Sequence, residues 1–219
     1  MSNVDLARYY AERAPEYERI YAKPERQVDL AKLREFIGRE FADKHVLEVA
    51  CGTGYWTEVL ASSAASVYAT DINEEVLAIA GAKSPIANNP DVRLIRADAY
   101  TLGGVPRAPA CLIAFWWSHI PKGRLAAFLD VVHSKLLPGA TVVAMDNRYV
   151  ASSSTPVHRR DVEGNEYQLR KLDDGSTHEV LKNFPSETEL KDAVAEFTDT
   201  ATVELLEYYW ILRYTARVH

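Results

Sequence analysis

Two glycines near the end of a predicted strand are spaced to form a ligand-binding turn. The run from Val46 to Ala50 is apolar, breaks at Cys51-Gly-Thr-Gly54 and resumes with helical spacing, which predicts a strand, a tight turn and a helix. Gly52 and Gly54 permit positive φ and let a ligand approach the backbone, because they carry no Cβ. The N–H groups and dipole of the following helix favour an anionic group there. The turn therefore predicts a cradle for a cofactor that carries a phosphate or a carboxylate.

An aspartate ends the next predicted strand, at residues 66–71. In a Rossmann-like fold, Asp71 would lie at the carboxyl edge of the sheet, where its two oxygens could accept hydrogen bonds from both hydroxyls of a ribose. The alternative is an N-cap for the next predicted helix, at 74–82, and the two roles are compatible. The glycine turn and Asp71 together favour a cofactor that contains a nucleoside.

The glycine spacing separates two classes of cofactor. A dinucleotide-binding turn has a third glycine where this chain has Thr57, so an NAD(P)-dependent oxidoreductase is disfavoured. The stretch Glu48-Val-Ala-Cys-Gly-Thr-Gly54 resembles motif I of the class I S-adenosylmethionine-dependent methyltransferases, E/D-x-G-x-G-x-G. Ala50 stands where the first glycine is common and should narrow the turn slightly without closing it. A βα turn without a ligand is the alternative for the motif taken alone.

The resemblance implies a cofactor and a set of residues that bind it. The cofactor would be S-adenosyl-L-methionine and the product S-adenosyl-L-homocysteine. Ile72 would pack on the adenine, Asp98 would accept from the adenine amino group, and the N–H of Ala99 would donate to a ring nitrogen; for Asp98, a role in forming a turn is the alternative. The expected cofactor-binding residues are Glu48, Ala50, Cys51, Gly52, Gly54, Asp71, Ile72, Asp98, Ala99 and Trp116.

The end of the fourth predicted strand, 110–117, is expected to border the acceptor. The strand is almost continuously apolar and leads into Trp116-Trp-Ser-His-Ile-Pro121, and open α/β sheets bind ligands outside the carboxyl ends of their strands. Trp116 and Trp117 could offer a flat face to an aromatic or heteroaromatic acceptor, with one of them expected in the core. His119 is the candidate general base. The equal alternative is that His119 only shapes the pocket or bonds a backbone group.

Tyrosines are frequent in the first 22 residues, where Pro15 separates two short helical segments. The stretch from Tyr10 to Tyr17 resembles the helical lid of small-molecule methyltransferases, and the alternative is a staple that holds the N-terminus on the body. The expected substrate-binding residues are Tyr10, Tyr17, Trp117, Asn147 and Arg148.

The order of predicted elements indicates a Rossmann-like, doubly wound α/β fold. By resemblance, the sheet is seven-stranded and mostly parallel, in the order 3-2-1-4-5-7-6, with an antiparallel edge strand and a β-hairpin insertion after strand 5. Helices are predicted at 24–41, 74–82 and 123–137, and the remaining strands at 46–50, 92–96, 141–145, 202–206 and 209–215. We expect one domain, 1–219, made of N-terminal helices (1–41), a cofactor-binding core (42–149), the insertion (150–183), and a C-terminal helix with edge strands (184–219).

Composition narrows the class of partner. With 47% hydrophobic and 26% charged residues the chain is in the globular range, and its net charge of −6 disfavours nucleic acid as the main partner. Cys51 and Cys111 lack metal-ligand spacing and are expected in the core. No signal peptide or membrane-spanning stretch is apparent. We therefore expect a cytoplasmic monomer or homodimer that acts on a small-molecule acceptor, without metal.

Three functions remain compatible with these features. The resemblance favours methyl transfer by in-line displacement, promoted mainly by alignment of the reactants and exclusion of water. An NAD(P)-dependent oxidoreductase and a non-catalytic module that binds S-adenosylmethionine are the alternatives, because fold does not determine function.

Overall fold

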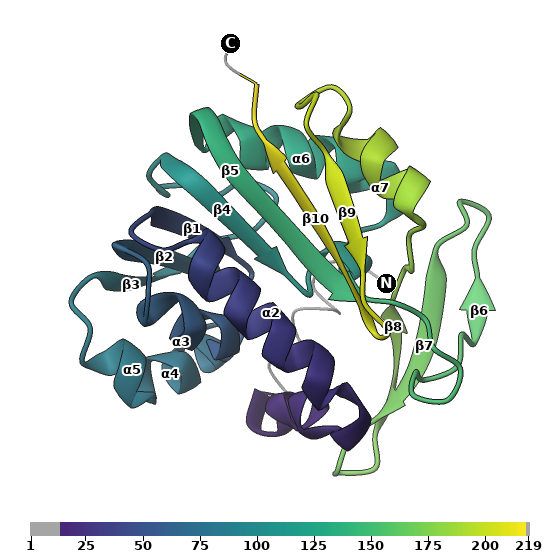
Figure 1. The fold of residues 1–219 in the computed structure, drawn as a ribbon. Coiled ribbons are helices and arrows are strands. Elements are labelled where there is room, and N and C mark those ends of the chain that lie inside the picture. The colour runs from purple at the N-terminus through teal and green to yellow at the C-terminus, as the bar shows by residue number, and fades with distance from the viewer. Residues whose placement is uncertain (1–13, 218–219) are drawn as a thin grey trace.

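The structure, a computed structural model, describes residues 14–217, with side chains from residue 18 onward. The main strands are β1 (His45–Val49), β2 (Ser66–Asp71), β3 (Val92–Arg96), β4 (Ala108–Ala114), β5 (Leu136–Asn147), β9 (Thr202–Leu205) and β10 (Tyr209–Thr215). They form one sheet in the order β3-β2-β1-β4-β5-β10-β9 (Figure 1). The first five strands in this order are parallel, and β10 is antiparallel to both of its neighbours. The predicted Rossmann-like order is confirmed, with β9 and β10 as its sixth and seventh strands.

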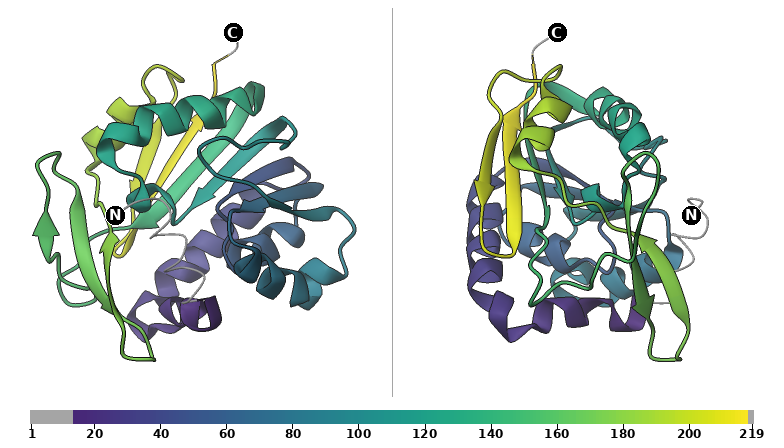
Figure 2. Two further views of the ribbon diagram at one scale, coloured as in Figure 1. Left: turned by 180° about the vertical axis from the view of Figure 1, so that it is seen from behind. Right: turned by 90° about the vertical axis from the view of Figure 1, so that its right-hand side faces the viewer.

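Helices cover both faces of the sheet (Figure 1 and Figure 2). Neighbouring residues of a strand point to opposite faces, so Val46 joins one apolar core and Leu47 the other. The first core includes Leu33 of α2, and the second includes Phe128 of α6 and Leu190 of α7. The helices are α2 (Gln27–Glu40), α3 (Tyr55–Ala61), α4 (Glu74–Ala82), α5 (Ser84–Ala87), α6 (Leu125–Ser134) and α7 (Glu187–Val194).

The boundaries of two central strands differ from those predicted. β4 ends at Ala114 rather than at residue 117, because Phe115 takes a left-handed φ of 60° and a 3₁₀ turn, η3 (Trp117–His119), follows. The helix predicted to reach residue 137 ends at Ser134, and β5 begins at Leu136 rather than at 141. Pairing of Leu136 with Ala108 extends the ladder, with an irregular register before the pairing resumes. Sheet pairing therefore overrides the helical spacing of the last few residues.

The insertion forms a separate antiparallel sheet. It consists of β6 (Arg159–Arg160), β7 (Glu166–Lys171) and β8 (Thr177–Leu181), in that order. The turn at Asp174-Gly175 joins β7 to β8, so the predicted hairpin is present, whereas the two-residue β6 was not expected. Figure 2 shows this sheet standing beside the main sheet.

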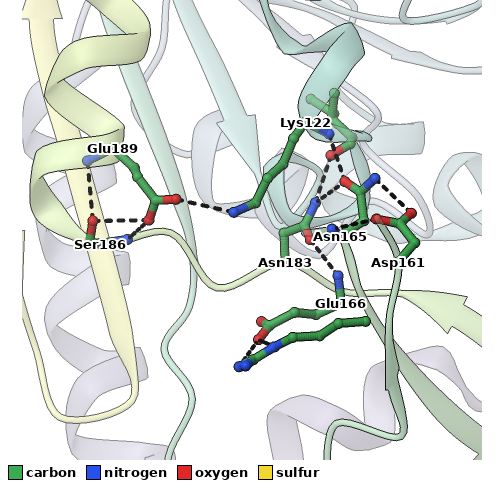
Figure 3. A network of polar contacts seen from close by, with 9 residues as sticks. Lys122, Asp161, Asn165, Glu166, Asn183, Ser186 and Glu189 are labelled. Carbon is green, nitrogen blue, oxygen red and sulfur yellow. Dashed lines mark hydrogen bonds and ion pairs between the residues drawn. The ribbon is translucent and has the colours of Figure 1, made fainter. Parts of the chain in front are cut away.

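Polar contacts fasten the base of the insertion to the body (Figure 3). The backbone N–H of Lys122 donates to Asn165 Oδ1, and Asn183 Nδ2 donates to the carbonyl of Ile120. Lys122 also pairs with Glu189 of the capping box that opens α7, at 3.2 Å. The insertion is therefore attached by the amides of Asn165 and Asn183, and the Lys122–Glu189 pair joins two parts of the body beside them.

The N-terminal part contains two 3₁₀ helices, η1 (Ala14–Ala22) and η2 (Pro24–Arg26), before α2 begins. The helix predicted over 24–41 thus starts as a 3₁₀ turn, with Pro24 in its first turn as expected. Among the residues described, none of the helices combines the length and the apolar character needed to cross a membrane.

Candidate active site

Residues predicted to bind ligands follow one another along the carboxyl edge of the parallel strands. Asp98 comes after β3, Asp71 ends β2, Glu48 is the next-to-last residue of β1, Trp116 follows β4, and Asn147 ends β5. Because these strands are neighbours in the order β3-β2-β1-β4-β5, the residues lie in a row across the sheet. This is the edge at which open α/β sheets bind ligands.

The turn after β1 contains three left-handed residues. The φ angles are 55° at Ala50, 56° at Gly52 and 81° at Gly54. A Cβ at Gly54 would lie 2.9 Å from both the Ala80 Cβ and the Ile86 Cδ1, so α4 or α5 would have to shift to make room for any other residue. Ala50 adopts the glycine-like conformation despite its Cβ, at a cost of about 1 kcal/mol. An alanine at this position therefore allows the same left-handed turn conformation that a glycine would take.

Asp71 connects this turn to the next helix. Its Oδ2 accepts from the N–H of Gly52 at 2.9 Å, and its Oδ1 accepts from the N–H of Asn73 at 3.0 Å. The N-cap of α4 is Asn73. Asp71 is therefore not the N-cap itself, although it bonds to the N-cap residue. Burial raises the pKa of Asp71 above its usual value. Each carboxylate oxygen has a further lone pair, so the group can also accept from two ribose hydroxyls.

Glu48 is a buried carboxyl with one oxygen that lacks a donor. Thr57 Oγ1 donates to Glu48 Oε2 at 2.7 Å, whereas Oε1 has no partner within the described part of the chain. Burial is the main cause that raises the pKa of Glu48 to about 8. A buried acceptor without a donor requires a ligand or a water molecule to satisfy it. The position therefore fits a cofactor that carries an ammonium or hydroxyl group.

The residues expected around the adenine have different environments. Asp98 Oδ1 accepts from the N–H of Tyr100 at 2.8 Å, so it forms the turn that was its alternative role. Ala99 is buried, while Ile72 is 40% exposed and presents an apolar surface at the edge. The exposed isoleucine, the acid of β2 and the glycine turn together fit a nucleoside bound across β1 to β3.

The 3₁₀ helix η1 packs against the turn between β1 and α3. The ring of Tyr21 stacks on that of Tyr55, with centroids 3.8 Å apart. Glu18 Oε1 accepts from Thr53 Oγ1 at 2.7 Å and pairs with Lys83 at 2.5 Å. The N-terminal segment therefore covers the cofactor cradle, as a lid or a staple would. Of the tyrosines predicted to bind substrate, Tyr10 lies outside the described residues, as does the side chain of Tyr17.

His119 is buried and bonded to the insertion. Its Nδ1 lies 2.7 Å from the carbonyl oxygen of Leu181, and because a carbonyl only accepts, Nδ1 must carry the proton and Nε2 the lone pair. Burial, followed by the charge of Lys182, lowers the pKa of His119 well below its usual value. The bond to a backbone group is one of the two roles that the sequence left open for this residue.

A buried ion pair lies beside His119. Lys182 Nζ donates to Asp146 Oδ1 at 2.9 Å and to Ser118 Oγ at 2.6 Å, and Ser118 Oγ donates to Asp146 Oδ2 at 2.7 Å. The side chains of Asp146 and Lys182 are 0% and 5% exposed. The positive charge of Lys182 helps to hold the pKa of Asp146 at about 2, against the opposing effect of burial. This pair joins the end of β5 to the end of the insertion.

Three of the residues predicted to bind substrate make contacts within the protein. Trp117 is buried against Trp210, with ring centroids 5.9 Å apart, so it is the tryptophan of the pair that belongs to the core. Asn147 Oδ1 accepts from Arg26 Nη1 at 2.8 Å. Arg148 donates to the carbonyl of Leu206 in the turn between β9 and β10. These contacts give Trp117 no exposed face for a ligand and direct Arg148 toward that turn.

Several residues near the site were not predicted from the sequence. Arg26 donates to Ser153 and lies over the rings of Tyr208 and Tyr209, and Lys182 pairs with Asp146. Their partners are distant in sequence, so no local spacing indicates them. Asp146 did carry a signal, because it occupies the end of a predicted strand in the same way as Asp71.

Comparison with known proteins points to the same edge of the sheet. Residues 46–139 match a family described as "Methyltransferase domain", a range that contains the glycine turn, Asp71 and Asp98. A comparison with the curated proteins finds no match.

Solved structures resemble the whole chain. A complex of DhpI with SAH is 27% identical, with 96% of this chain and 95% of that chain covered and a TM-score of 0.75. A DhpI-SAM-HEP complex is 26% identical, with coverage of 97% and 98% and a TM-score of 0.77. The N-methyltransferase NodS from Bradyrhizobium japonicum WM9 is 14% identical, with coverage of 89% and 98% and a TM-score of 0.62, and shows a similar fold only. Both DhpI structures hold the cofactor or product expected here.

Proposed function

The chain is a class I S-adenosylmethionine-dependent methyltransferase, and from that premise we propose that it methylates a small-molecule acceptor. The observation that carries the proposal is that two separate segments converge outside the carboxyl edge. Arg19 of η1 pairs with Asp173 at the tip of the insertion at 2.6 Å, and Lys23 donates to the carbonyl of Ser153 at 2.6 Å. An acceptor bound beneath these segments would be enclosed, which suits a small molecule better than a polymer.

The cofactor, S-adenosylmethionine, supplies an activated methyl group when it is bound. The turn from Ala50 to Gly54 and Glu48 would hold its amino-acid part, Asp71 its ribose, and Ile72 with Asp98 its base. The proposal for these residues is supported by the orphan Glu48 Oε1, the exposed Ile72 and the left-handed turn. The protein's contribution would be alignment and exclusion of water, which can supply about 7–11 kcal/mol.

His119 would receive a proton if the accepting atom carries one. Its Nδ1 is committed to the carbonyl of Leu181, so a proton from the acceptor would pass to Nε2. We expect His119→Ala to leave cofactor affinity intact and to lower turnover by about 10²-fold or more. Calorimetry with S-adenosylhomocysteine and rates with an acceptor would check both parts. Undiminished turnover would reject the proton-accepting role and leave His119 as a residue that shapes the pocket.

An aromatic or heteroaromatic acceptor is the finer form of the proposal. With Trp117 in the core, Trp116 is the remaining tryptophan at the end of β4, and its ring meets that of Tyr100 at 6.4 Å. Those two rings could border a flat acceptor. The proposal of an aromatic acceptor therefore depends on Trp116 alone and not on both tryptophans.

The experiment that tests the proposal is transfer of labelled methyl from S-adenosylmethionine to a pool of metabolites. A labelled small-molecule product that requires the protein is the expected result. Binding of S-adenosylhomocysteine with no product from any pool would favour the non-catalytic alternative. Competition of NADH with S-adenosylhomocysteine would instead favour an oxidoreductase.

A further inference from the structure

The face of the insertion that meets the body carries an arginine without a matching acceptor. Along β7, Gln168 and Arg170 alternate with the exposed Leu169 and Lys171, so they share the inward face. Arg170 Nη2 donates to Gln168 Oε1 at 2.9 Å, whereas its Nε is buried with no acceptor among the residues described. Guanidinium groups only donate, and buried donors are normally satisfied. The protein thus presents a cationic donor that these residues leave unsatisfied.

A second unsatisfied donor faces the same surface from the body. The ring of Trp116 packs against Leu172 and Val180 of the insertion. Leu172 lies two residues beyond Arg170, and Val180 is on the paired strand, so both contacts involve the inward face. The Trp116 Nε1 is also buried without an acceptor in the described part of the chain. Two N–H donors, one from each side, therefore lie at the interface between η3 and the insertion.

Arg170 adds a positive charge to this interface. Arg159, on the neighbouring strand, pairs with Glu179 at 2.6 Å, whereas the structure gives Arg170 no carboxylate partner among the residues it describes. After burial, the charge of Arg170 is among the causes that lower the pKa of both His119 and Lys23. These two groups come from η3 and from the segment between η1 and η2, and both bond to the insertion that carries Arg170. A positive centre in a protein of net charge −6 attracts an anionic ligand.

We propose that the methyl acceptor carries an oxyanion group, a carboxylate or a phosphoryl group, which Arg170 and Trp116 bind between the insertion and the end of β4. The inference rests on the proposed function, since it names the class of molecule that the same site accepts. An oxyanion has enough lone pairs to accept from the guanidinium and the indole together. It would satisfy both buried donors and balance the charge that the protein leaves open.

Inorganic phosphate is the probe for this site. Protein labelled with ¹⁵N and saturated with S-adenosylhomocysteine is titrated with phosphate at constant ionic strength, and the indole N–H signal of Trp116 is identified with Trp116→Phe. We expect a saturable downfield shift of that signal in the wild type. In Arg170→Gln the phosphate affinity should fall about tenfold or more, because a charged donor is lost. Lys171→Gln removes the same charge from the exposed face of the same strand and should leave the affinity unchanged.

A signal that does not respond, or responds equally in Arg170→Gln and the wild type, would overturn the proposal. Retained affinity for S-adenosylhomocysteine shows that Arg170→Gln is folded. Arg170→Lys keeps the positive charge but loses the planar set of guanidinium donors, so it should bind phosphate with intermediate affinity. Turnover of a neutral acceptor that Arg170→Gln does not alter would contradict the oxyanion while the proposed function stands. An Arg170-dependent phosphate response with no turnover of any acceptor would support the site and count against the proposed function.

Discussion

At the scale of single residues, backbone conformation and crowding make distinct demands on the turn after β1. Gly54 meets both, because it is left-handed and because its missing Cβ leaves space for Ala80 and Ile86. Gly104 is left-handed too, with φ of 74°, but nothing lies within 4 Å of the position its Cβ would take. Substitutions at these two glycines therefore separate the cost of a left-handed conformation from the cost of crowding.

We expect Gly104→Ala to lower the free energy of unfolding by about 1 kcal/mol, the cost of a left-handed alanine. Gly54→Ala should cost a further ~1–3 kcal/mol because its Cβ overpacks the turn, and it alone should weaken binding of S-adenosylhomocysteine. Urea unfolding and calorimetry of the two variants test this. Equal losses of stability would mean that α4 and α5 yield to the added methyl group.

The protonation of Glu48 couples pH to stability. Burial raises its pKa to about 8 in the folded chain, from an ordinary value of 4.5. A group whose pKa is raised on folding stabilises the fold fully below its unfolded pKa, and that contribution is lost as pH rises through the folded pKa. We therefore expect wild-type stability to decline between pH 5 and 8, by on the order of a few kcal/mol.

Glu48→Gln should remove most of this decline, because glutamine stays neutral and can still accept from Thr57. Thermal unfolding across the pH range measures the difference between the two proteins, and Glu75→Gln, at an exposed position of α4, is the control. Parallel pH profiles for wild type and Glu48→Gln would show that another group is responsible.

Residues with local signals were predicted, and residues with remote partners were not. The left-handed turn at Gly52 and Gly54 and the position of Asp71 at a strand end could be predicted, because glycine spacing and the end of an apolar run indicate them locally. Arg170 and Lys182 lie in a polar stretch whose spacing indicates only a hairpin. Lys182 pairs with Asp146, and Arg170 lies on the face of the insertion that packs on Trp116, and only the fold brings these segments together.

At the scale of elements, strands and helices with clear periodicity matched the prediction. β2, β3 and α4 have the predicted bounds, since apolar runs and turn residues delimit each of them. The ends of β4 and β5 were missed, because Phe115 takes a left-handed conformation and the pairing of Leu136 with Ala108 begins before the predicted strand. Such boundaries depend on neighbouring strands rather than on local sequence.

The attachment of the insertion depends on the buried pair of Asp146 and Lys182. We expect Lys182→Met to lower the free energy of unfolding by about 3–5 kcal/mol, because it leaves a buried carboxylate without its cation. The double variant Asp146→Asn with Lys182→Met should lose less than the sum of the single losses. On the surface, Lys191→Met breaks a pair with Glu187 and should cost at most about 0.5 kcal/mol. Additive losses in denaturant unfolding would contradict direct coupling of the buried pair.

At the scale of the molecule, the two segments over the site are held in different ways. The insertion is fixed at its base by a buried ion pair and by the amides of Asn165 and Asn183. At its tip, Asp173 pairs with Arg19 of η1, and these side chains are 63% and 67% exposed. Exposed pairs contribute little to stability. The base is therefore the firm part of the enclosure, and the Arg19–Asp173 contact at the tip contributes less to stability.

The account as a whole depends on the claim that the turn after β1 and Asp71 hold S-adenosylmethionine. Calorimetric titration of wild type and Asp71→Ala with S-adenosylhomocysteine tests it most directly. We predict saturable binding at one site in the wild type and a loss of about 1–3 kcal/mol of binding free energy in the variant, because a charged hydrogen-bond acceptor is removed. Equal affinity of the two proteins, or no binding by the wild type, would contradict the claim.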